Sequence, residues 1–128
     1  MKKEFVPYEL AVKLKELGFD EPCFVYYNRS NENKPAYPNH GVTQNSLCGN
    51  GTTAPLYQQA FRWFREKYKL HTEIRPYTAK YFTIIIQECK DIVKYIEYGG
   101  IDLKFNTYEE AELACLEKLI EIVESKSE

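Results

Sequence analysis

The chain contains few of the residues that build catalytic or metal centres. It has 128 residues, of which only two are histidines, His40 and His71, and four are cysteines. The cysteines are Cys23, Cys48, Cys89 and Cys115, at intervals of 25, 41 and 26 residues. No pair has the short spacing of zinc ligands or redox motifs. We therefore expect no metal and no other cofactor.

The sequence also lacks long apolar stretches. None approaches the length of a membrane span, and residues 1–5 do not lead into the apolar segment of a signal peptide. These absences predict a cytoplasmic protein with free thiols and no membrane association. The Asn28-Arg29-Ser30 and Asn50-Gly51-Thr52 glycosylation sequons are then chance matches.

An excess of positive charge is missing as well. The formal net charge is −2 and the sequence pI is about 5.8, which disfavours a general nucleic-acid binder. The charges are nevertheless segregated. Residues 62–80 hold six basic and two acidic side chains, whereas residues 107–128 hold seven Glu and two Lys.

A near-repeated helix pattern is the most informative feature that is present. Tyr57-Gln58-Gln59-Ala60 precedes Glu66-Lys67, and Tyr108-Glu109-Glu110-Ala111 precedes Glu117-Lys118, at a constant offset of 51 residues. Each copy follows a stretch that is typical of strands. The length fits one domain, so we predict a single α+β domain over 1–128. Its helices would pack on one face of a mainly antiparallel sheet, and a ββα duplication is a further hypothesis.

The predicted order is α-β-(β)-α-β-β-α. Residues 7–17 are expected to form a helix that Gly18 ends, and residues 22–27 a strand. Residues 28–53 are either an irregular surface loop or a long hairpin with a second strand from 41 to 47. A helix with Phe61 and Phe64 on its apolar side is predicted from Ala54 to Tyr68.

Strands are predicted at 71–75 and 80–87. Residues 89–98 fit either a strand or a helix, and we favour a strand paired with 80–87; residues 101–105 are a further candidate for the sheet. The final helix begins at a capping box, Thr107 with Glu110. It is expected to run to about Glu124 with Cys115 buried, followed by a frayed tail at 125–128.

The best candidate binding surface is the basic side of the 54–68 helix. Arginine and aromatic side chains together can hold single-stranded nucleic acid or form protein hot spots. The alternative is a solvated helix face whose Arg stems cover apolar neighbours. The candidate residues are Arg62, Arg65, Lys69, Arg75 and Trp63.

Other constellations give weaker indications of chemistry. The Gly49–Thr53 loop resembles a phosphate-binding turn, but it lacks a Walker lysine, and a turn with a Thr52 or Thr53 helix cap explains it more simply. A thiol–imidazole dyad of either histidine with Cys23 or Cys48 has no support in the spacing. Asp20-Glu21 and Glu109-Glu110 are adjacent carboxylates, which do not converge on a helix. No residue is therefore predicted to be catalytic.

Four stretches together resemble a family of small uncharacterised proteins encoded by gut bacteria and their phages. They are residues 5–11, 14–23, 54–68 and 107–116, which include Phe5-Val6-Pro7-Tyr8, Phe61-Arg62-Trp63-Phe64-Arg65 and Thr107-Tyr108-Glu109-Glu110. The resemblance implies a phage or mobile-element origin and transfers no activity, cofactor or site residue.

Three hypotheses follow for function. The first is a non-enzymatic protein-interaction module that binds an unknown protein or itself, which the tyrosine content and the segregated charge favour. The second is a nucleic-acid binder that uses the basic helix face. The third is a small-ligand protein or enzyme that uses the Gly49–Thr53 loop.

Overall fold

A computed structural model of the chain describes residues 4–28, 30–39, 41–76, 78–89, 93–96 and 104–126. Over these residues the fold is α+β, as predicted, with three helices and two antiparallel three-stranded sheets in the order α1-β1-β2-β3-α2-β4-β5-β6-α3. The expectation of one sheet is corrected to two. The chain divides into two compact units, residues 1–59 and 60–128.

Helix α1 (Tyr8–Glu16) opens the first unit. Pro7 lies at its N-cap with extended backbone angles, one residue before the first helical position expected for it. Gly18 ends the helix with a φ of 98°, and the Phe19 N–H donates to the Leu14 carbonyl at 2.9 Å. This is the Schellman arrangement, which requires a left-handed residue that glycine adopts at little cost.

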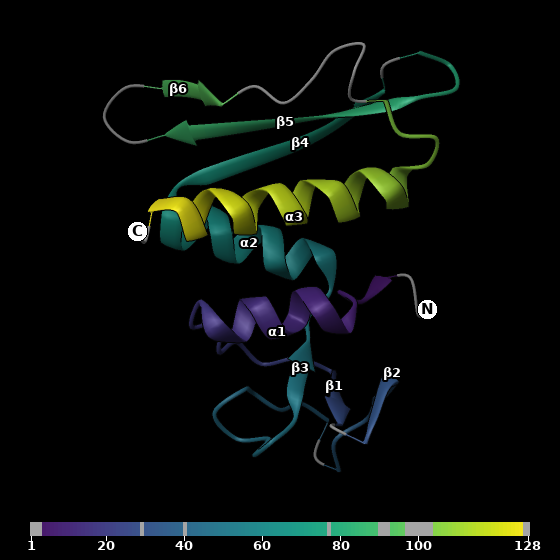
Figure 1. Ribbon diagram of the computed structural model, residues 1–128, viewed down its shortest axis with the longest axis vertical. Coiled ribbons are helices and arrows are strands. Elements are labelled where there is room, and N and C mark those ends of the chain that lie inside the picture. The colour runs from purple at the N-terminus through teal and green to yellow at the C-terminus, as the bar shows by residue number, and fades with distance from the viewer. Residues whose placement is uncertain are drawn as a thin grey trace. The chain divides into compact units, whose positions relative to one another are not determined.

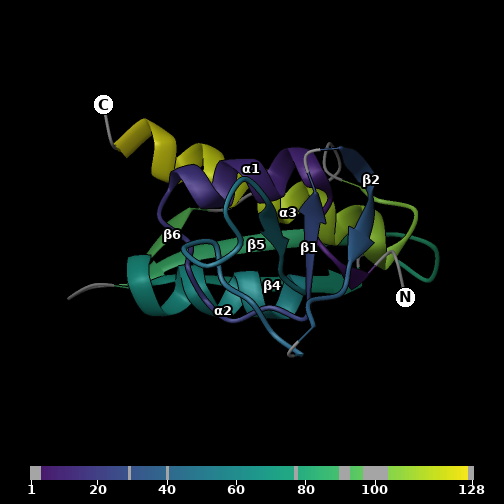
Figure 2. The ribbon, with the colours of Figure 1, turned by 90° about the horizontal axis from the view of Figure 1, so that it is seen from below.

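The first sheet has the order β2-β1-β3, with β1 (Val25–Asn28) in the centre. Strand β2 (Asn31–Ala36) and strand β3 (Thr52–Ala54) both pair antiparallel with it. Figure 2 shows β1 and β2 side by side, and α1 packs against β3 (Figure 1).

The structure decides between the alternatives for residues 28–53 and corrects the start of the following helix. The hairpin strand considered at 41–47 does not form, and Thr43 makes an isolated bridge to Cys23. The strand lies instead at 31–36, where hairpin pairing with β1 overrides the weak β-propensity of Asn-Glu-Asn-Lys-Pro-Ala. Residues 52–54 are a strand rather than a helix cap because they complete the other edge of β1, so α2 begins at Tyr57 instead of Ala54.

Helix α2 (Tyr57–Tyr68) leads into the second unit, whose sheet is the simple meander β4-β5-β6. Its strands are β4 (Leu70–Pro76), β5 (Phe82–Cys89) and β6 (Val93–Ile96). The strand predicted within 89–98 is therefore confirmed at β6. Phe82 also bridges Phe105, whereas residues 101–103 lie outside the described part of the chain.

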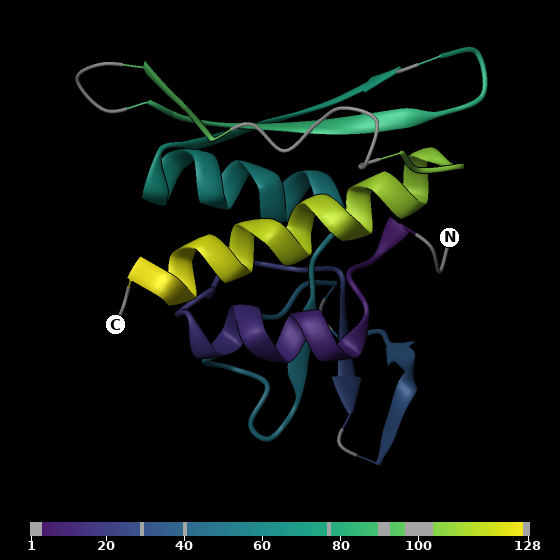
Figure 3. The same cartoon turned by 45° about the horizontal axis from the view of Figure 1, so that its top comes forward.

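Helix α3 (Tyr108–Lys126) packs on β4 and β5 (Figure 3). The Glu110 N–H donates to Thr107 Oγ1 at 3.1 Å, as expected of a capping box. The reciprocal contact differs from the prediction by one residue, since the Glu110 carboxylate accepts from the Asn106 N–H at 3.2 Å. Cys115 is fully buried, as predicted. The helix continues to Lys126, past the expected end, and residues 127–128 lie outside the described residues.

The repeated helix pattern corresponds to two helix starts. Helices α2 and α3 begin at Tyr57 and Tyr108, the first residues of the two copies. The sheets before them are not copies of each other, because the first strand is central in one and the second strand is central in the other. The shared pattern therefore reflects similar helices rather than a duplicated ββα topology.

Candidate interaction surface

Exposed apolar side chains are concentrated in one short part of the first unit. Among the described residues, five large hydrophobic side chains are exposed, and four of them lie between residues 24 and 47. Isolated exposed apolar residues are common, but a concentration of them indicates an interaction site. The four are Phe24 (56% exposed), Tyr37 (68%), Val42 (49%) and Leu47 (71%).

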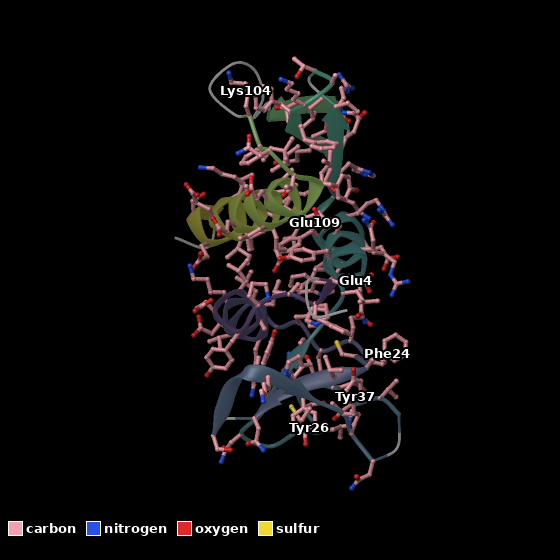
Figure 4. The ribbon with its side chains drawn as sticks, turned by 90° about the vertical axis from the view of Figure 1, so that its right-hand side faces the viewer. Glu4, Phe24, Tyr26, Tyr37, Lys104 and Glu109 are labelled. Atoms are coloured by element: carbon pink, nitrogen blue, oxygen red, sulfur yellow. The ribbon has the colours of Figure 1, made fainter. Side chains whose placement is uncertain are left out.

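The backbone brings Phe24 and Val42 together. Cys23 and Thr43 exchange two hydrogen bonds, at 2.8 and 2.9 Å, which makes them a paired bridge of two antiparallel segments. Phe24 follows Cys23 and Val42 precedes Thr43, so these two residues adjoin the bridge on the same side. Cys23 is buried, whereas Phe24 and Val42 are both exposed. Figure 4 shows Phe24 near Tyr26 and Tyr37, around the strands of the first sheet.

Asn45 fixes the loop that carries Val42 and Leu47. Its side chain is buried, with 8% exposed. Its Nδ2 donates to the Phe19 carbonyl at 2.7 Å, and its Oδ1 accepts from the Thr53 N–H at 2.9 Å. One amide thus connects the segment after α1 to β3 and satisfies two backbone groups.

Asp20 provides a second attachment for the same loop. Its Oδ1 accepts from the Ser46 N–H at 2.8 Å, and its carbonyl accepts from Gln44 Nε2 at 2.8 Å. Leu47 then closes a turn by donating to the Gln44 carbonyl at 2.9 Å. Because the backbone on both sides of Asn45 is attached, Leu47 is presented from a defined turn rather than from a free loop.

The Gly49–Thr53 segment is occupied by structural contacts. The Gly51 N–H donates to the Cys48 carbonyl at 2.9 Å, and the Gly51 carbonyl accepts from Lys15 Nζ at 2.7 Å. A Cβ at Gly51 would lie 3.1 Å from the Tyr26 ring, closer than ordinary contacts. The segment leads into β3 rather than into a helix, so it lacks the helix N-terminal amides on which the phosphate-binding interpretation rested.

The thiols of the first unit are held in their neutral form. Burial is the largest of several influences on the Cys23 thiol, and it raises the pKa to about 11. The Cys23 Sγ donates to the Glu21 carbonyl at 3.3 Å. Burial also raises the pKa of Cys48, and the positive charge of Lys15 partly offsets this increase. A nucleophilic cysteine needs a lowered pKa, so neither residue has the environment of an activated thiol.

The basic candidate surface is only partly assembled as predicted. Arg62 and Arg65 are exposed on α2 while Phe61 and Phe64 are buried, which confirms the predicted sidedness of this helix. Among the described residues neither arginine forms an ion pair or hydrogen bond through its side chain. Lys69 is also exposed and donates to the Glu66 carbonyl at 3.3 Å.

The other two predicted members of that surface have different environments. Trp63 is 7% exposed and packs edge-on against Phe64 and Tyr68, with Lys67 Nζ 5.0 Å from its ring centroid. Its ring is therefore covered and presents no stacking platform. Arg75 lies on β4 and pairs with Glu73 through two hydrogen bonds, at 3.0 and 3.1 Å.

The remaining candidates for chemistry are dispersed. His71 is half-exposed in β4 opposite Gln87, and His40 lies outside the described residues. Within the part of the chain that the structure covers, no three His, Cys, Asp or Glu side chains form a possible metal site. No helix among those residues has the length and apolar composition needed to span a membrane.

Comparison with known proteins assigns no family to this chain. No protein-family model matches this sequence, and no curated protein or solved structure matches it. The residues that define the exposed apolar surface were not identified from the sequence. Phe24 lies in a strand-like segment whose exposed side the pattern did not reveal, and Asn45 is one of many polar residues in a polar stretch.

Proposed function

We propose that this chain is a non-enzymatic protein-interaction module. Its docking surface is formed by Phe24, Val42 and Leu47, and its partner is another polypeptide. The observation that carries the proposal is that these exposed apolar side chains stand on fixed backbone: Phe24 and Val42 adjoin the bridge between Cys23 and Thr43, and Leu47 lies on the loop that Asn45 and Asp20 attach. Ordering a loop before binding reduces the entropy lost on association, so such a surface is suited to a specific contact.

The two alternative functions, a nucleic-acid binder and a small-ligand site at Gly49–Thr53, have less support. A binder of single strands needs exposed rings for stacking, whereas Trp63 is covered by its helix neighbours and by Lys67. A nucleotide site at Gly49–Thr53 needs free backbone amides, whereas the Gly51 N–H is used in a turn. The resemblance to small proteins of gut bacteria and their phages supports placing the module in a phage or mobile element.

Site-specific photocross-linking tests the proposal. A benzophenone amino acid is placed at Phe24 or at Leu47 in the full chain, which is then irradiated in a lysate of the native host. We expect discrete cross-linked products from both positions. The matched control places the same group at Glu117, an exposed position on α3, where we expect none of these products.

The identified partner is then measured against a double variant, Phe24→Ser with Val42→Ser. Truncating two central apolar contacts costs roughly 1–2 kcal/mol each at a hot spot, so we expect binding to weaken at least tenfold. Circular dichroism establishes that the double variant is folded. Equal binding by the double variant and the unaltered chain would refute the proposed surface.

A further inference from the structure

The second unit ends in an open sheet edge. Strand β4 is the first strand in the order β4-β5-β6, and among the described residues it pairs only with β5. The strand also contains Pro76, which lacks a backbone N–H and is tolerated mainly on sheet edges. Glu73, Arg75 and Pro76 are exposed, so the strand offers a surface along which another strand can add.

The hydrogen-bond pattern identifies the backbone groups that face this edge. Phe82 and Phe105 exchange two hydrogen bonds at 2.9 Å, so the N–H and C=O of Phe82 point away from β4. Backbone groups alternate in direction along a strand, and Phe82 is opposite Pro76 in the register. The groups of Thr72, Ile74 and Pro76 therefore point outward, while those of Glu73 and Arg75 bond to β5.

The charges on this strand are self-complementary. Glu73 and Arg75 are two residues apart, so they lie on the same face of the sheet, and their side chains are about half exposed. Glu73 is negatively charged and Arg75 is positively charged. In an antiparallel pair of identical strands centred on Ile74, Glu73 of one copy lies opposite Arg75 of the other, and the reverse also holds.

We infer that β4 pairs antiparallel with β4 of a second copy of this chain, about a two-fold axis through Ile74. The Ile74 N–H groups donate to the Ile74 carbonyls across the axis. Each Thr72 N–H donates to the Pro76 carbonyl of the other copy. This arrangement makes four hydrogen bonds, needs no N–H from Pro76, and extends two three-stranded sheets into one of six strands.

Neighbouring registers are less favourable because they oppose like charges. Centring the pair on Glu73 places the two Glu73 carboxylates opposite each other. Centring it on Thr72 places Arg75 opposite the Lys69 position of the other copy. Like charges directly opposite in adjacent strands are destabilising, so the charges select the register centred on Ile74.

This inference names a second surface and a second partner, and it does not depend on the Phe24 surface. Sedimentation velocity from micromolar to millimolar concentration measures the association. We expect the 128-residue chain to change from monomer to dimer over this range, and added salt to weaken the dimer. A chain that stays monomeric throughout would overturn the inference and leave the cross-linking result at Phe24 unaffected.

A charge-swap cycle tests the register. Glu73→Arg alone and Arg75→Glu alone each replace two attractive cross-strand pairs with two repulsive ones, and we expect each to weaken the dimer about tenfold or more. Mixing the two single variants opposes unlike charges again, so we expect a heterodimer to form. A merely structural role of Glu73 would not produce this recovery.

The matched control is Glu117→Arg, which makes the same charge change at an exposed position on α3. We expect it to dimerise like the unaltered chain. Thermal unfolding of each variant checks that the monomer remains folded. A dimer that survives both single substitutions, or a mixture that fails to associate, would show that β4 is not the interface.

Discussion

The Thr53 N–H donates to Asn45 Oδ1 at 2.9 Å, within the buried part of the first unit. The side-chain amide of Asn45 also donates to the Phe19 carbonyl, through Nδ2. A single polar side chain thus connects the segment after α1 to the strand β3. This explains how a stretch rich in Asn, Ser and Gly adopts a defined path and can hold apolar side chains outward.

Replacement of Asn45 is expected to destabilise the fold. Asn45→Ala removes two buried hydrogen bonds, to the Phe19 carbonyl and from the Thr53 N–H, which costs roughly 2–4 kcal/mol in the free energy of unfolding. Asn45→Asp keeps the acceptor for Thr53 but cannot donate to Phe19, so it should also destabilise. Urea denaturation measures both. Ser46→Ala is the control at an exposed neighbouring position, and an Asn45→Ala variant as stable as this control would contradict the role given to Asn45.

Lys69 occupies a position that suits glycine. It follows the end of α2 with a φ of 60°, in the left-handed region. A non-glycine residue there is strained by roughly 1–2 kcal/mol. Glycine removes this strain but loses more conformational entropy on folding, so only part of the strain energy is gained as stability. We expect Lys69→Gly to raise the free energy of unfolding by about 0.5–1 kcal/mol. Thermal and urea unfolding measure the gain.

The control for that prediction is Arg65→Gly, inside the same helix. Glycine in a helix interior costs about 1 kcal/mol relative to a good helix former, so this variant should unfold more easily. Opposite signs for the two glycine substitutions are the expected outcome. A loss of stability in both would indicate that the Lys69 backbone angle carries no strain.

Thr107 is expected to stabilise the start of α3. Its Oγ1 accepts from the Glu110 N–H, and loss of an N-cap acceptor costs about 1 kcal/mol. Thr107→Ala should lower the free energy of unfolding by that amount, and Thr107→Ser should retain most of it because serine keeps the hydroxyl. Equal losses in the two variants would assign the effect to packing instead.

Cys115 predicts a dependence of stability on alkaline pH. Burial raises the pKa of its thiol from 9.0 to about 12. The folded state therefore keeps a proton that the unfolded state loses above pH 9, so stability falls as pH rises from 9 towards 12. The slope from one thiol approaches roughly 1.4 kcal/mol per pH unit.

The comparison variant for this effect is Cys115→Ala, which has no thiol to titrate. Below pH 9 the variant should be less stable because it leaves a small cavity. The difference in free energy of unfolding between the two proteins should shrink as pH rises through the window set by the raised pKa of Cys115. A difference that stays constant from pH 8 to 11 would argue against the neutral buried thiol.

Local residue chemistry was sufficient to predict several elements. The stop of α1 at Gly18, the cap at Thr107 and the strand pairing around Ile86 depend on residues near each other in the chain. Strand β2 was not predictable in this way, because Asn31–Ala36 has little β-propensity and forms through pairing with β1. The same holds for the start of α2, which pairing of Thr53 with Tyr26 delays beyond Ala54.

The sequence by itself determined the α+β class, the sidedness of α2 and the exposure of Arg62 and Arg65, because spacing along a helix decides which side chains share a face. Only the tertiary structure decided that Trp63 is covered, that Phe24 is exposed and that Asn45 connects two distant backbone segments. The physical reason is that burial depends on neighbours contributed by remote parts of the chain. A buried hydrogen bond between distant residues likewise leaves no periodic trace in the order of amino acids.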